Sequence, residues 1–446
     1  MQSHSRRQFT KLLASATAVG VAAPLALNLS SFASASAENS GEYKALICLN
    51  LGGGNDHINT FPSMDAGSYR QYASARGALS IARDELHSMP AASQQNGLEL
   101  GFNPKLSGLK QLYDRGRLAV VTNVGPLVGA TTKAEIETGK AALPAYLGSH
   151  NDQQRLWLTQ SGTPGTGWGG RLADHFSDSN AIPALTQIST SGFSFFSVGE
   201  RTSALQIGEY GEPELFFEPG SAMEAAVTGS GSRSNLLEAA YAQTNEALRD
   251  STRSLVAAMP SNTSLTPPPG NGRFSLAQQL QSVVRAIAAS KTLGIKRQIF
   301  IVSHDGFDTH SNQLDRHPQL LEQLDQSIVY LDLLLGSLGL LNNVTLFSTS
   351  EFGRSYVPNN GGTDHGWGSH HIVMGGAVRG GNVFGKIPDP HVNGPDFVSG
   401  GMMIPSISTT QYAATFGKWM GVPTSELSRI LPDLQRFDQA DLGFLN

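Results

Sequence analysis

Residues 43–59 read YKALICLNLGGGNDHIN, and this stretch decides the fold. Its first nine residues are almost continuously apolar, which is the pattern of a β-strand buried on both faces. Three glycines then end the strand abruptly, and Asn55, Asp56 and His57 follow. Strands of this kind belong to parallel sheets covered by helices on each side. The stretch therefore predicts an α/β fold with its chemistry beyond the carboxyl end of this strand.

Further strands and helices alternate along the chain. Three more apolar runs predict buried strands: residues 118–124, 298–303 and 344–349. Helical periodicity covers residues 106–115 and 313–338. A helix between two such strands requires a parallel crossover, so we predict a doubly wound, mainly parallel sheet. Residues 184–198 and 372–378 look like further strands.

Residues 218–292 differ in character from the rest of the chain. Helical periodicity covers residues 235–259 and 276–292, and Pro267-Pro268-Pro269-Gly270 lies in the segment between them. We predict a helical insertion here, within a single α/β domain that spans residues 38–446.

The amino terminus has the parts of a twin-arginine (Tat) export signal in the expected order. Arg6-Arg7 is followed by a weakly apolar run and by Ala-Ser-Ala at residues 35–37, a small-x-small cleavage site. The run is rich in Ala, Ser and Gly, so it would span a membrane poorly as an uncleaved anchor. We therefore predict a signal at residues 1–37, recognition by the Tat machinery and cleavage after Ala37. The predicted product is periplasmic, with no stable membrane anchor.

The composition is that of a soluble globular enzyme. The chain has 31 Lys and Arg against 36 Asp and Glu, a formal net charge of −5. Nucleic acid is excluded as an expected partner, because binding its phosphates requires clustered Lys and Arg. The single Cys48 excludes an internal disulfide, and its apolar surroundings predict a buried core residue.

The densest group of ligand-type side chains is GGTDHGWGSHH at residues 361–371. It places one Asp and three His in a glycine-rich loop before an apolar run. Imidazole and carboxylate are ligand types that Zn and Mn favour. The alternative is a solvated loop whose His residues bond to backbone, which explains one or two His better than the whole group. We therefore predict a metal or catalytic site here.

Other ligand-type residues follow the predicted strands. Asp56 comes after the first strand, Asp308 and His310 after the third, and Glu351 after the fourth. In a parallel sheet these ends share one edge, so residues far apart in sequence can meet. Two divalent ions about 4 Å apart would need roughly six to eight such ligands, about the number the chain supplies. Asp56 could instead cap a helix, and Glu351 could pair with Arg354.

Five motifs, in order, resemble those of a large family of Tat-exported bacterial proteins of unknown function within the alkaline phosphatase and sulfatase-like superfamily. The motifs are Leu51-Gly52-Gly53-Gly54-Asn55-Asp56-x-x-Asn59, Ser149-His150, Phe307-Asp308-Thr309-His310, Ser350-Glu351-Phe352-Gly353-Arg354 and Gly362-Thr363-Asp364-His365-Gly366. They extend over nearly the whole chain after the predicted signal. The resemblance implies a metal-dependent hydrolase core.

The resemblance also implies metal ligands. Asp56 matches an Asp that binds one metal, and Asp308 and His310 are similar to ligands of the other, although the superfamily often spaces these two more widely. His365 or His370 matches a further His ligand in a glycine-rich loop.

The sequence departs from the superfamily pattern after the fourth strand. An Asp-His pair usually follows the fourth strand, but here the position reads Glu351-Phe352. This departure leaves open whether one or two ions bind. His57 and His371 could orient the ligands rather than bind an ion.

The nucleophile of the superfamily is a Ser or Thr at a helix amino terminus, and Ser149 matches it. A plain helix N-cap is the alternative for this serine. His150 could serve as acid, base or ligand, and Arg354 would neutralise charge on the equatorial oxygens. The formylglycine mechanism of sulfatases is disfavoured, because Ser149 lacks the Pro-x-Arg context that it requires.

Two hypotheses of different classes follow. The first is a periplasmic metal-dependent hydrolase of phosphate or sulfate esters, with one or two Zn, Mn or Ca ions activating Ser149 against a small or polymeric anionic ester. The second is a non-catalytic periplasmic binding or assembly protein that retains the fold. Phe352 favours the second hypothesis, and the density of ligand-type residues at the strand ends favours the first.

Overall fold

The computed structural model describes residues 43–90, 97–160, 164–208, 236–261, 266–269 and 275–446. Residues 43–446 form one compact unit. The predicted export signal and its cleavage site after Ala37 lie outside the described residues. The predicted insertion lies partly outside them.

A parallel sheet built around β1 (Lys44–Gly52) forms the centre of the molecule. β1 pairs in parallel with β7 (Arg297–Asp305) on one side and with β8 (Val344–Thr349) on the other. Beyond β7, β5 (Gln187–Ser189) and β6 (Leu205–Gln206) continue the sheet in parallel. The predicted doubly wound, mainly parallel α/β fold is confirmed.

One strand of this sheet runs against the others. β11 (Ser369–Met374) lies between β8 and β4 (Leu118–Gly125) and is antiparallel to both. β12 (Val383–Phe384) and β15 (Ile407–Ser408) pair in parallel with β4. β11 begins before the predicted residues 372–378, so it takes in two His residues that the sequence had assigned to a loop.

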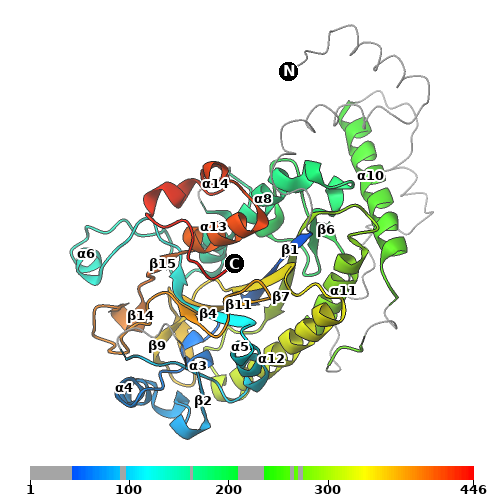
Figure 1. Cartoon of the computed structure of the whole chain (residues 1–446). Helices are drawn as coiled ribbons and strands as arrows, with labels where there is room; N and C mark the ends of the chain where they lie inside the picture. The colour runs from blue at the N-terminus through cyan, green and yellow to red at the C-terminus, as the bar shows by residue number, and fades with distance from the viewer. Residues whose placement is uncertain (1–42, 91–96, 161–163, 209–235, 262–265, 270–274) are drawn as a thin grey trace, which may run out of the picture. The chain divides into compact units, whose positions relative to one another are not determined.

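The first hydrophobic core lies between the sheet and three helices, α5 (Ser107–Asp114), α11 (Leu276–Ala289) and α12 (Gln313–Ser337) (Figure 1). Alternate residues of β1 from Ala45 to Leu51 enter this core and are at most 3% exposed. A strand has a period of two, so the intervening residues of β1 must face the other side of the sheet.

The second core lies on that other side, under α8 (Trp168–Phe176) and α13 (Thr409–Met420) (Figure 1). Cys48 of β1 is buried here, as predicted, and Phe347 of β8 stacks on Phe416 with ring centroids 4.3 Å apart. Both faces of the central strands are therefore covered, which is why these strands are nearly continuous apolar runs in the sequence.

The predicted helices around residues 106–115, 276–292 and 313–338 correspond to α5, α11 and α12. α10 (Leu236–Ala258) and α11 confirm the helices predicted over residues 235–259 and 276–292, and α11 belongs to the first core of the sheet. The expectation of strands over residues 184–198 is largely wrong, since among these residues only β5 is a strand of the sheet. The Ser- and Phe-rich composition there has no period of two, so it gave a poor signal.

The carboxyl ends of β1, β7 and β8 lie at one edge of the sheet, since the three strands run in parallel. A two-stranded hairpin of β9 (Arg354–Pro358) and β10 (Thr363–His365) follows β8 at this edge. The fold thus brings together loops that are up to 300 residues apart, as the contact between Gly54 and Glu351 shows.

No helix in the described ranges is long and apolar enough to cross a membrane.

Phe347 tests the second core, because its side chain is fully buried. We expect Phe347→Ala to lower the free energy of unfolding by about 3–5 kcal/mol, since it leaves a cavity between two packed layers. Leu314→Ala is the control, because that side chain on α12 is 58% exposed, and it should change stability by no more than about 0.5 kcal/mol. Urea denaturation measures both variants; equal losses would contradict this core.

Candidate metal centre

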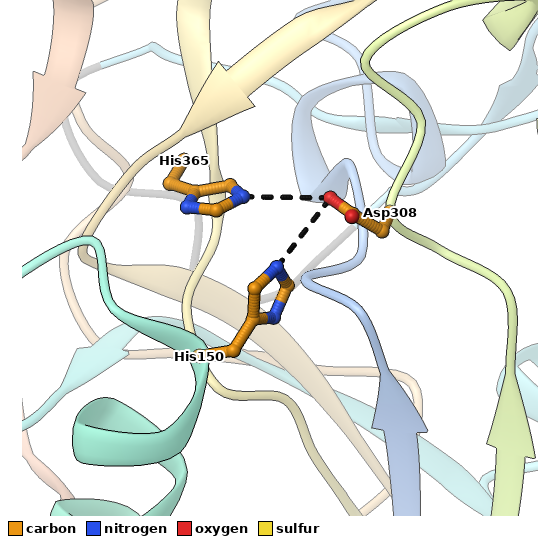
Figure 2. A group of neighbouring side chains, drawn as sticks. All are labelled: His150, Asp308 and His365. Atoms are coloured by element: carbon orange, nitrogen blue, oxygen red, sulfur yellow. Dashed lines mark ion pairs between the residues drawn. The ribbon is translucent and has the colours of Figure 1, made fainter.

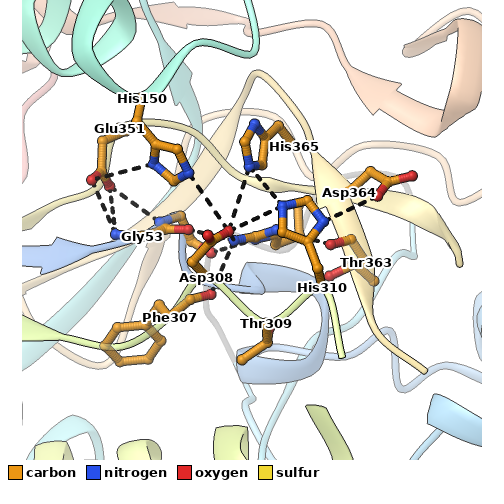
Figure 3. Close-up of polar contacts among 12 residues, drawn as sticks. Gly53, His150, Phe307, Asp308, Thr309, His310, Glu351, Thr363, Asp364 and His365 are labelled. Carbon is orange, nitrogen blue, oxygen red and sulfur yellow. Dashed lines mark hydrogen bonds and ion pairs between the residues drawn. The ribbon is translucent and has the colours of Figure 1, made fainter. Parts of the chain in front are cut away.

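Three imidazole rings converge on one carboxylate oxygen at the carboxyl edge of the sheet (Figure 3). Oδ1 of Asp308 lies 3.6 Å from Nε2 of His150, 3.1 Å from Nε2 of His310 and 3.4 Å from Nε2 of His365. Asp308 and His310 follow β7, His365 ends β10, and His150 opens α7 (His150–Thr159). Four of the residues predicted from the sequence as catalytic or metal-binding therefore meet.

The segment after β7 explains why Asp308 and His310 face the same way. Phe307 and Thr309 are fully buried, while the side chains of Asp308 and His310 are 45% and 43% exposed. Alternate residues of an extended segment point to opposite sides. The apolar and hydroxyl side chains therefore anchor the segment and turn the two ionisable groups toward the cluster.

The separations of three ligand atoms fit a single cation (Figure 2). Ligands of a tetrahedral Zn²⁺ at about 2.0–2.1 Å lie about 3.4 Å from each other. Oδ1 of Asp308 is 3.6 Å from His150 and 3.4 Å from His365, close to that value. His150, Asp308 and His365 each offer an atom within 4.8 Å of the other two. This group fits a divalent ion in spacing and in donor type.

The backbone fixes the tautomer of His365. Its Nδ1 lies 2.5 Å from the carbonyl oxygen of Gly148. A carbonyl only accepts, so the ring proton is on Nδ1 and Nε2 presents its lone pair to the cluster. Burial lowers the pKa of His365, the nearby Arg354 charge adds to this, and the Gly148 hydrogen bond opposes it. The ring is therefore a neutral, oriented nitrogen donor, which is the state that a metal requires.

His310 lies between the carboxylate of Asp364 and the ring of His365. Its Nδ1 lies 3.1 Å from Oδ1 of Asp364, and its Nε2 lies 2.8 Å from Nε2 of His365. The carboxylate of Asp364 accepts, so Nδ1 of His310 donates to it, and the two Nε2 atoms are joined by one hydrogen bond. The 2.8 Å separation is also shorter than the roughly 3.4 Å expected between two ligands of one tetrahedral Zn²⁺. The structure therefore places His310 beside the ion-binding group rather than in it.

Glu351 lies behind His150. Its Oε1 is 3.8 Å from Nδ1 of His150, and its carboxylate accepts hydrogen bonds of 3.0–3.1 Å from the backbone N–H groups of Gly53 and Gly54. Gly53 has φ 111°, and a Cβ there would lie 2.4 Å from the backbone nitrogen of Asp308, so this turn requires glycine. Glu351 was predicted as a metal ligand, but its carboxylate is used in hydrogen bonds that hold the turn after β1.

Arg354 ties the loops of the centre together. Its side chain is fully buried and donates to the carbonyl oxygens of Gly54 at 2.9 Å and Thr363 at 2.8 Å. Its Nη2 also donates to the carbonyl oxygen of Phe307 and to Oδ1 of Asp308. The sequence had suggested that Arg354 faces a substrate. The structure does not place it there, because its N–H groups are used in hydrogen bonds inside the protein.

The same guanidinium sets the charge of Asp308. Partial burial alone would raise the pKa of Asp308, but the hydrogen bond and the positive charge of Arg354 outweigh it and lower that pKa. The carboxylate is therefore ionised at neutral pH, as a metal ligand must be. The expected pairing of Glu351 with Arg354 is replaced by this pairing with Asp308.

Ser149 is the N-cap of α7. Its hydroxyl donates to Oδ2 of Asp152 at 2.6 Å and accepts from the backbone N–H of Asp152 at 3.4 Å. These bonds are those of an ordinary capping serine. The structure therefore matches the N-cap alternative, and it gives the Ser149 hydroxyl no hydrogen bond to the cluster among the residues it describes.

Asp56 and His370, both predicted as metal ligands, lie elsewhere. Asp56 is fully buried and pairs with Arg76, and it does not cap α3 (His57–Thr60) with its side chain. His370 is buried in β11, where its Nδ1 accepts from the backbone N–H of Asn123 at 3.0 Å, and burial lowers its pKa to about 3.

The two residues expected to orient ligands are also buried away from the cluster. The rings of His57 and His370 lie edge to face with centroids 4.7 Å apart. His371 hydrogen bonds through Nδ1 to Ser348 at 3.2 Å. His371 is buried because β11 starts early and draws the end of the glycine-rich stretch into the sheet, whereas His57 is buried as the first residue of α3.

From the sequence, Asp364 was included in the predicted loop but given no role of its own, and the carbonyl of Gly148 was not identified. Asp364 stands next to His365 in the quoted loop, so its position beside a His was visible. Its pairing with His310, 54 residues away, depends on tertiary contacts. A hydrogen bond from Asn359 lowers the pKa of Asp364, with the His310 bond adding to this against partial burial. The backbone acceptor at Gly148 has no sequence signal.

Residues 43–422 match the family model described as "Protein of unknown function (DUF1501)", so the chain belongs to this family. This confirms the predicted membership of a family of unknown function. No curated protein matches the sequence.

Several solved structures are similar to the chain. One is a protein in the alkaline phosphatase superfamily from Vibrio parahaemolyticus, with 12% identity over 89% of this chain and 71% of that chain and a TM-score of 0.41. Another is the PsFucS1 sulfatase from Pseudoalteromonas sp., with 12% identity over 99% and 76% and a TM-score of 0.35. The lipoteichoic acid synthase LtaP from Listeria monocytogenes has 9% identity over 87% and 76% and a TM-score of 0.35. At such scores, these similarities carry no argument about the chemistry of this chain.

The state of His365 can be measured by NMR in the metal-free protein. Folding lowers the pKa of this ring, so we expect its midpoint below the ordinary value of about 6.5. The unfolded chain then binds the proton more readily, and acidification through about pH 6.5 removes stability. Long-range proton–nitrogen spectra should show the proton on Nδ1. A proton on Nε2, or a midpoint above the ordinary value, would contradict the role given to Gly148.

Proposed function

We propose that this member of the DUF1501 family is a periplasmic metal-dependent hydrolase of phosphate or sulfate esters. The observation that carries the proposal is the convergence of Nε2 of His150 and Nε2 of His365 on Oδ1 of Asp308, at 3.6 and 3.4 Å. These three residues would hold one divalent ion. Two imidazoles and a carboxylate suit Zn or Mn better than Ca, which prefers oxygen ligands alone.

A cation is needed before an anionic ester can approach this centre. Asp308, Glu351 and Asp364 bring three carboxyl groups, while the Arg354 guanidinium is buried beneath them. When bound, a divalent ion supplies Lewis-acid chemistry to the ester. The amino terminus of α7, at His150, adds the positive end of a helix dipole. Charge balance therefore favours an anionic substrate once the ion is in place.

The centre is open enough for a substrate to enter. The side chains of Asp308 and His150 are 45% and 35% exposed. Structural zinc sites are closed by four protein ligands, whereas catalytic sites have three and keep a position open. Three ligands on an exposed edge correspond to the catalytic arrangement.

His310 is the acid–base group of the proposed reaction. Water attacks phosphorus or sulfur, and the bond from that atom to the leaving oxygen breaks. The imidazolium of His310 gives its Nε2 proton to the leaving oxygen, and the proton released by the attacking water restores it. Asp364 holds the ring in place through Nδ1 at 3.1 Å. Water is the nucleophile here because the Ser149 hydroxyl is engaged with Asp152.

A second candidate function is a periplasmic binding or assembly protein that holds the ion without hydrolysis. The observation in its favour is that two groups expected to act on the substrate are used inside the protein. Ser149 caps α7, and Arg354 bonds to backbone carbonyls and Asp308. Hydrolysis, if present, then depends on the ion and His310 alone.

Export is proposed on the sequence alone. The Tat signal predicted at residues 1–37 would bring the chain to the Tat machinery, which carries folded proteins and so permits an ion to be inserted before export. The substrate would then be a small or polymeric anionic ester that reaches the periplasm.

The proposal is tested by loading the protein with Zn or Mn and measuring release of p-nitrophenol from its phosphate and sulfate esters. We expect turnover that falls to the uncatalysed rate in Asp308→Asn and His365→Ala, together with loss of the ion measured by elemental mass spectrometry. Ser149→Ala should keep the activity. Asp389→Asn is the matched control, because Asp389 pairs with His391 at 2.5 Å on an exposed loop.

Each outcome separates the two candidate functions. Ion binding without hydrolysis of any ester in a wider screen would support the binding protein and contradict the hydrolase. Loss of activity in Ser149→Ala, with the ion retained, would restore the serine as nucleophile.

Asp364 tests the acid–base role of His310. We expect Asp364→Asn to lower kcat by about 10–100-fold, since the partner that orients a catalytic or ligating imidazole is typically worth that much. The bound ion should remain, because His310 lies outside the ion-binding group. Loss of the ion in this variant would instead make His310 a ligand.

A further inference from the structure

We infer that Arg76 takes the place of a second metal ion beside Asp56, so that the centre binds one divalent ion rather than two. The family resemblance implies an ion at Asp56, but the residues present do not fit one. The inference rests on the proposed function for the ion held by His150, Asp308 and His365, and it extends that proposal to the number of ions.

The first observation is that both oxygens of Asp56 are already used. Nη1 of Arg76 lies 2.8 Å from Oδ2 and Nη2 lies 2.8 Å from Oδ1, which is a bidentate pair. The amide of Gln313 also donates to Oδ2. Asp56 is fully buried and Arg76 is 1% exposed. Burial alone would raise the pKa of Asp56, but the charge of Arg76, the charge of His317 and the hydrogen bonds from Arg76 and Gln313 together lower that pKa, so the pair is ionic.

The second observation is that an entering ion would meet a buried positive charge. Removing one partner from a buried ion pair leaves an uncompensated charge, which is strongly destabilising. To bind Asp56, an ion would have to displace Arg76. His317, whose charge acts on Asp56, already hydrogen bonds to Asn55 at 3.1 Å. Among the described residues, the ligand-type side chains that lie close enough to hold an ion together are His150, Asp308 and His365, and Asp56 is not among them.

The third observation is that the fold aims Arg76 at this pocket. Arg76 is the last residue of α4 (Ala66–Arg76), where the negative end of the helix dipole favours a cation. Its guanidinium carbon lies 5.6 Å from the centroid of the Tyr356 ring, within the range of a cation–π contact. The helix ends at Gly77, with φ 52°. The guanidinium of Arg76 is thus held beside Asp56 by its place at the end of α4 and by its packing on Tyr356.

The fourth observation concerns the position where the family pattern has a His after the fourth strand. Here Phe352 fills it, and its ring packs against His365 and His150 with centroid separations of 4.3 and 4.9 Å. A phenyl ring offers no lone pair to an ion. Phe352 therefore cannot serve as a metal ligand between the cluster and Asp56.

Arg76 also does the orienting work that an ion at Asp56 would do. Arg76 holds Asp56 in place, and the side-chain nitrogen of Gln313 donates to Asp56. The side-chain oxygen of Gln313 then accepts from the hydroxyls of Thr363 at 2.8 Å and Thr309 at 3.3 Å. Thr309 lies between Asp308 and His310, and Thr363 precedes Asp364. The pair thereby braces both segments that carry the proposed centre.

The experiment counts ions per chain while the mature protein is titrated with Zn²⁺, by isothermal titration calorimetry and elemental mass spectrometry. We expect one ion in the wild type, one in the double variant Asp56→Asn with Arg76→Gln, and none in Asp308→Asn. The double variant removes both charges together, so no unpaired buried charge is left. Two ions in the wild type, with one lost in the double variant, would overturn the inference.

A second experiment tests the role of Arg76 by thermal unfolding and needs no bound ion. Arg76→Ala should unfold at a lower temperature than the wild type, and millimolar guanidinium should raise that temperature by filling the vacated position. Arg117→Ala is the control, because its pair with Asp332 is partly exposed, with Nη1 and Oδ2 2.7 Å apart, and guanidinium should not stabilise it. An unchanged melting temperature in Arg76→Ala, or the same response in both variants, would overturn the inference.

The two experiments separate this inference from the proposed function. A wild type that binds no ion refutes the proposed hydrolase, while the response of Arg76→Ala to guanidinium still decides the role of Arg76. If Arg76→Ala does not fold, the ion count of the wild type decides the inference.

Discussion

The buried guanidinium of Arg354 is the interaction on which the centre depends. It bonds to the backbone after β1, after β7 and in β10, three segments that meet only in the folded chain. It also holds Asp308 ionised at the point where the imidazoles converge. A buried charge is costly unless its partners satisfy it, and here carbonyl oxygens and one carboxylate do so. The parallel sheet supplies the shared edge, and Arg354 fixes the loops upon it.

Two fixed cations, Arg354 and Arg76, lie beneath a cluster that is otherwise rich in carboxylates. Each is paired with an Asp, and in each case the arginine keeps the carboxylate ionised against the effect of burial. The difference is exposure: Asp308 reaches the surface and Asp56 does not. Only the exposed carboxylate is open to an ion from solvent, which is why we propose one ion in place of two.

The sequence predicted the fold and part of the centre, for reasons that lie in particular residues. The central strands were found because burial on both faces makes them continuously apolar. Asp308 was singled out because parallel strands share one carboxyl edge, and His365 because ligand-type residues are dense in its loop; the structure brings the two side chains together. Asp56 was misjudged because its partner, Arg76, can be identified only from the packing of α4. His370 was misjudged because β11 begins inside the glycine-rich stretch, so the ring points into the sheet.

The central claim is that His150, Asp308 and His365 bind one divalent ion. The most direct measurement is anomalous X-ray diffraction at the zinc edge from crystals of the mature protein grown with Zn²⁺. The account predicts one strong peak per chain at the centre, within about 2.0–2.3 Å of Nε2 of both histidines and of Oδ1 of Asp308. A peak beside Asp56, or no peak at the three residues, would contradict it.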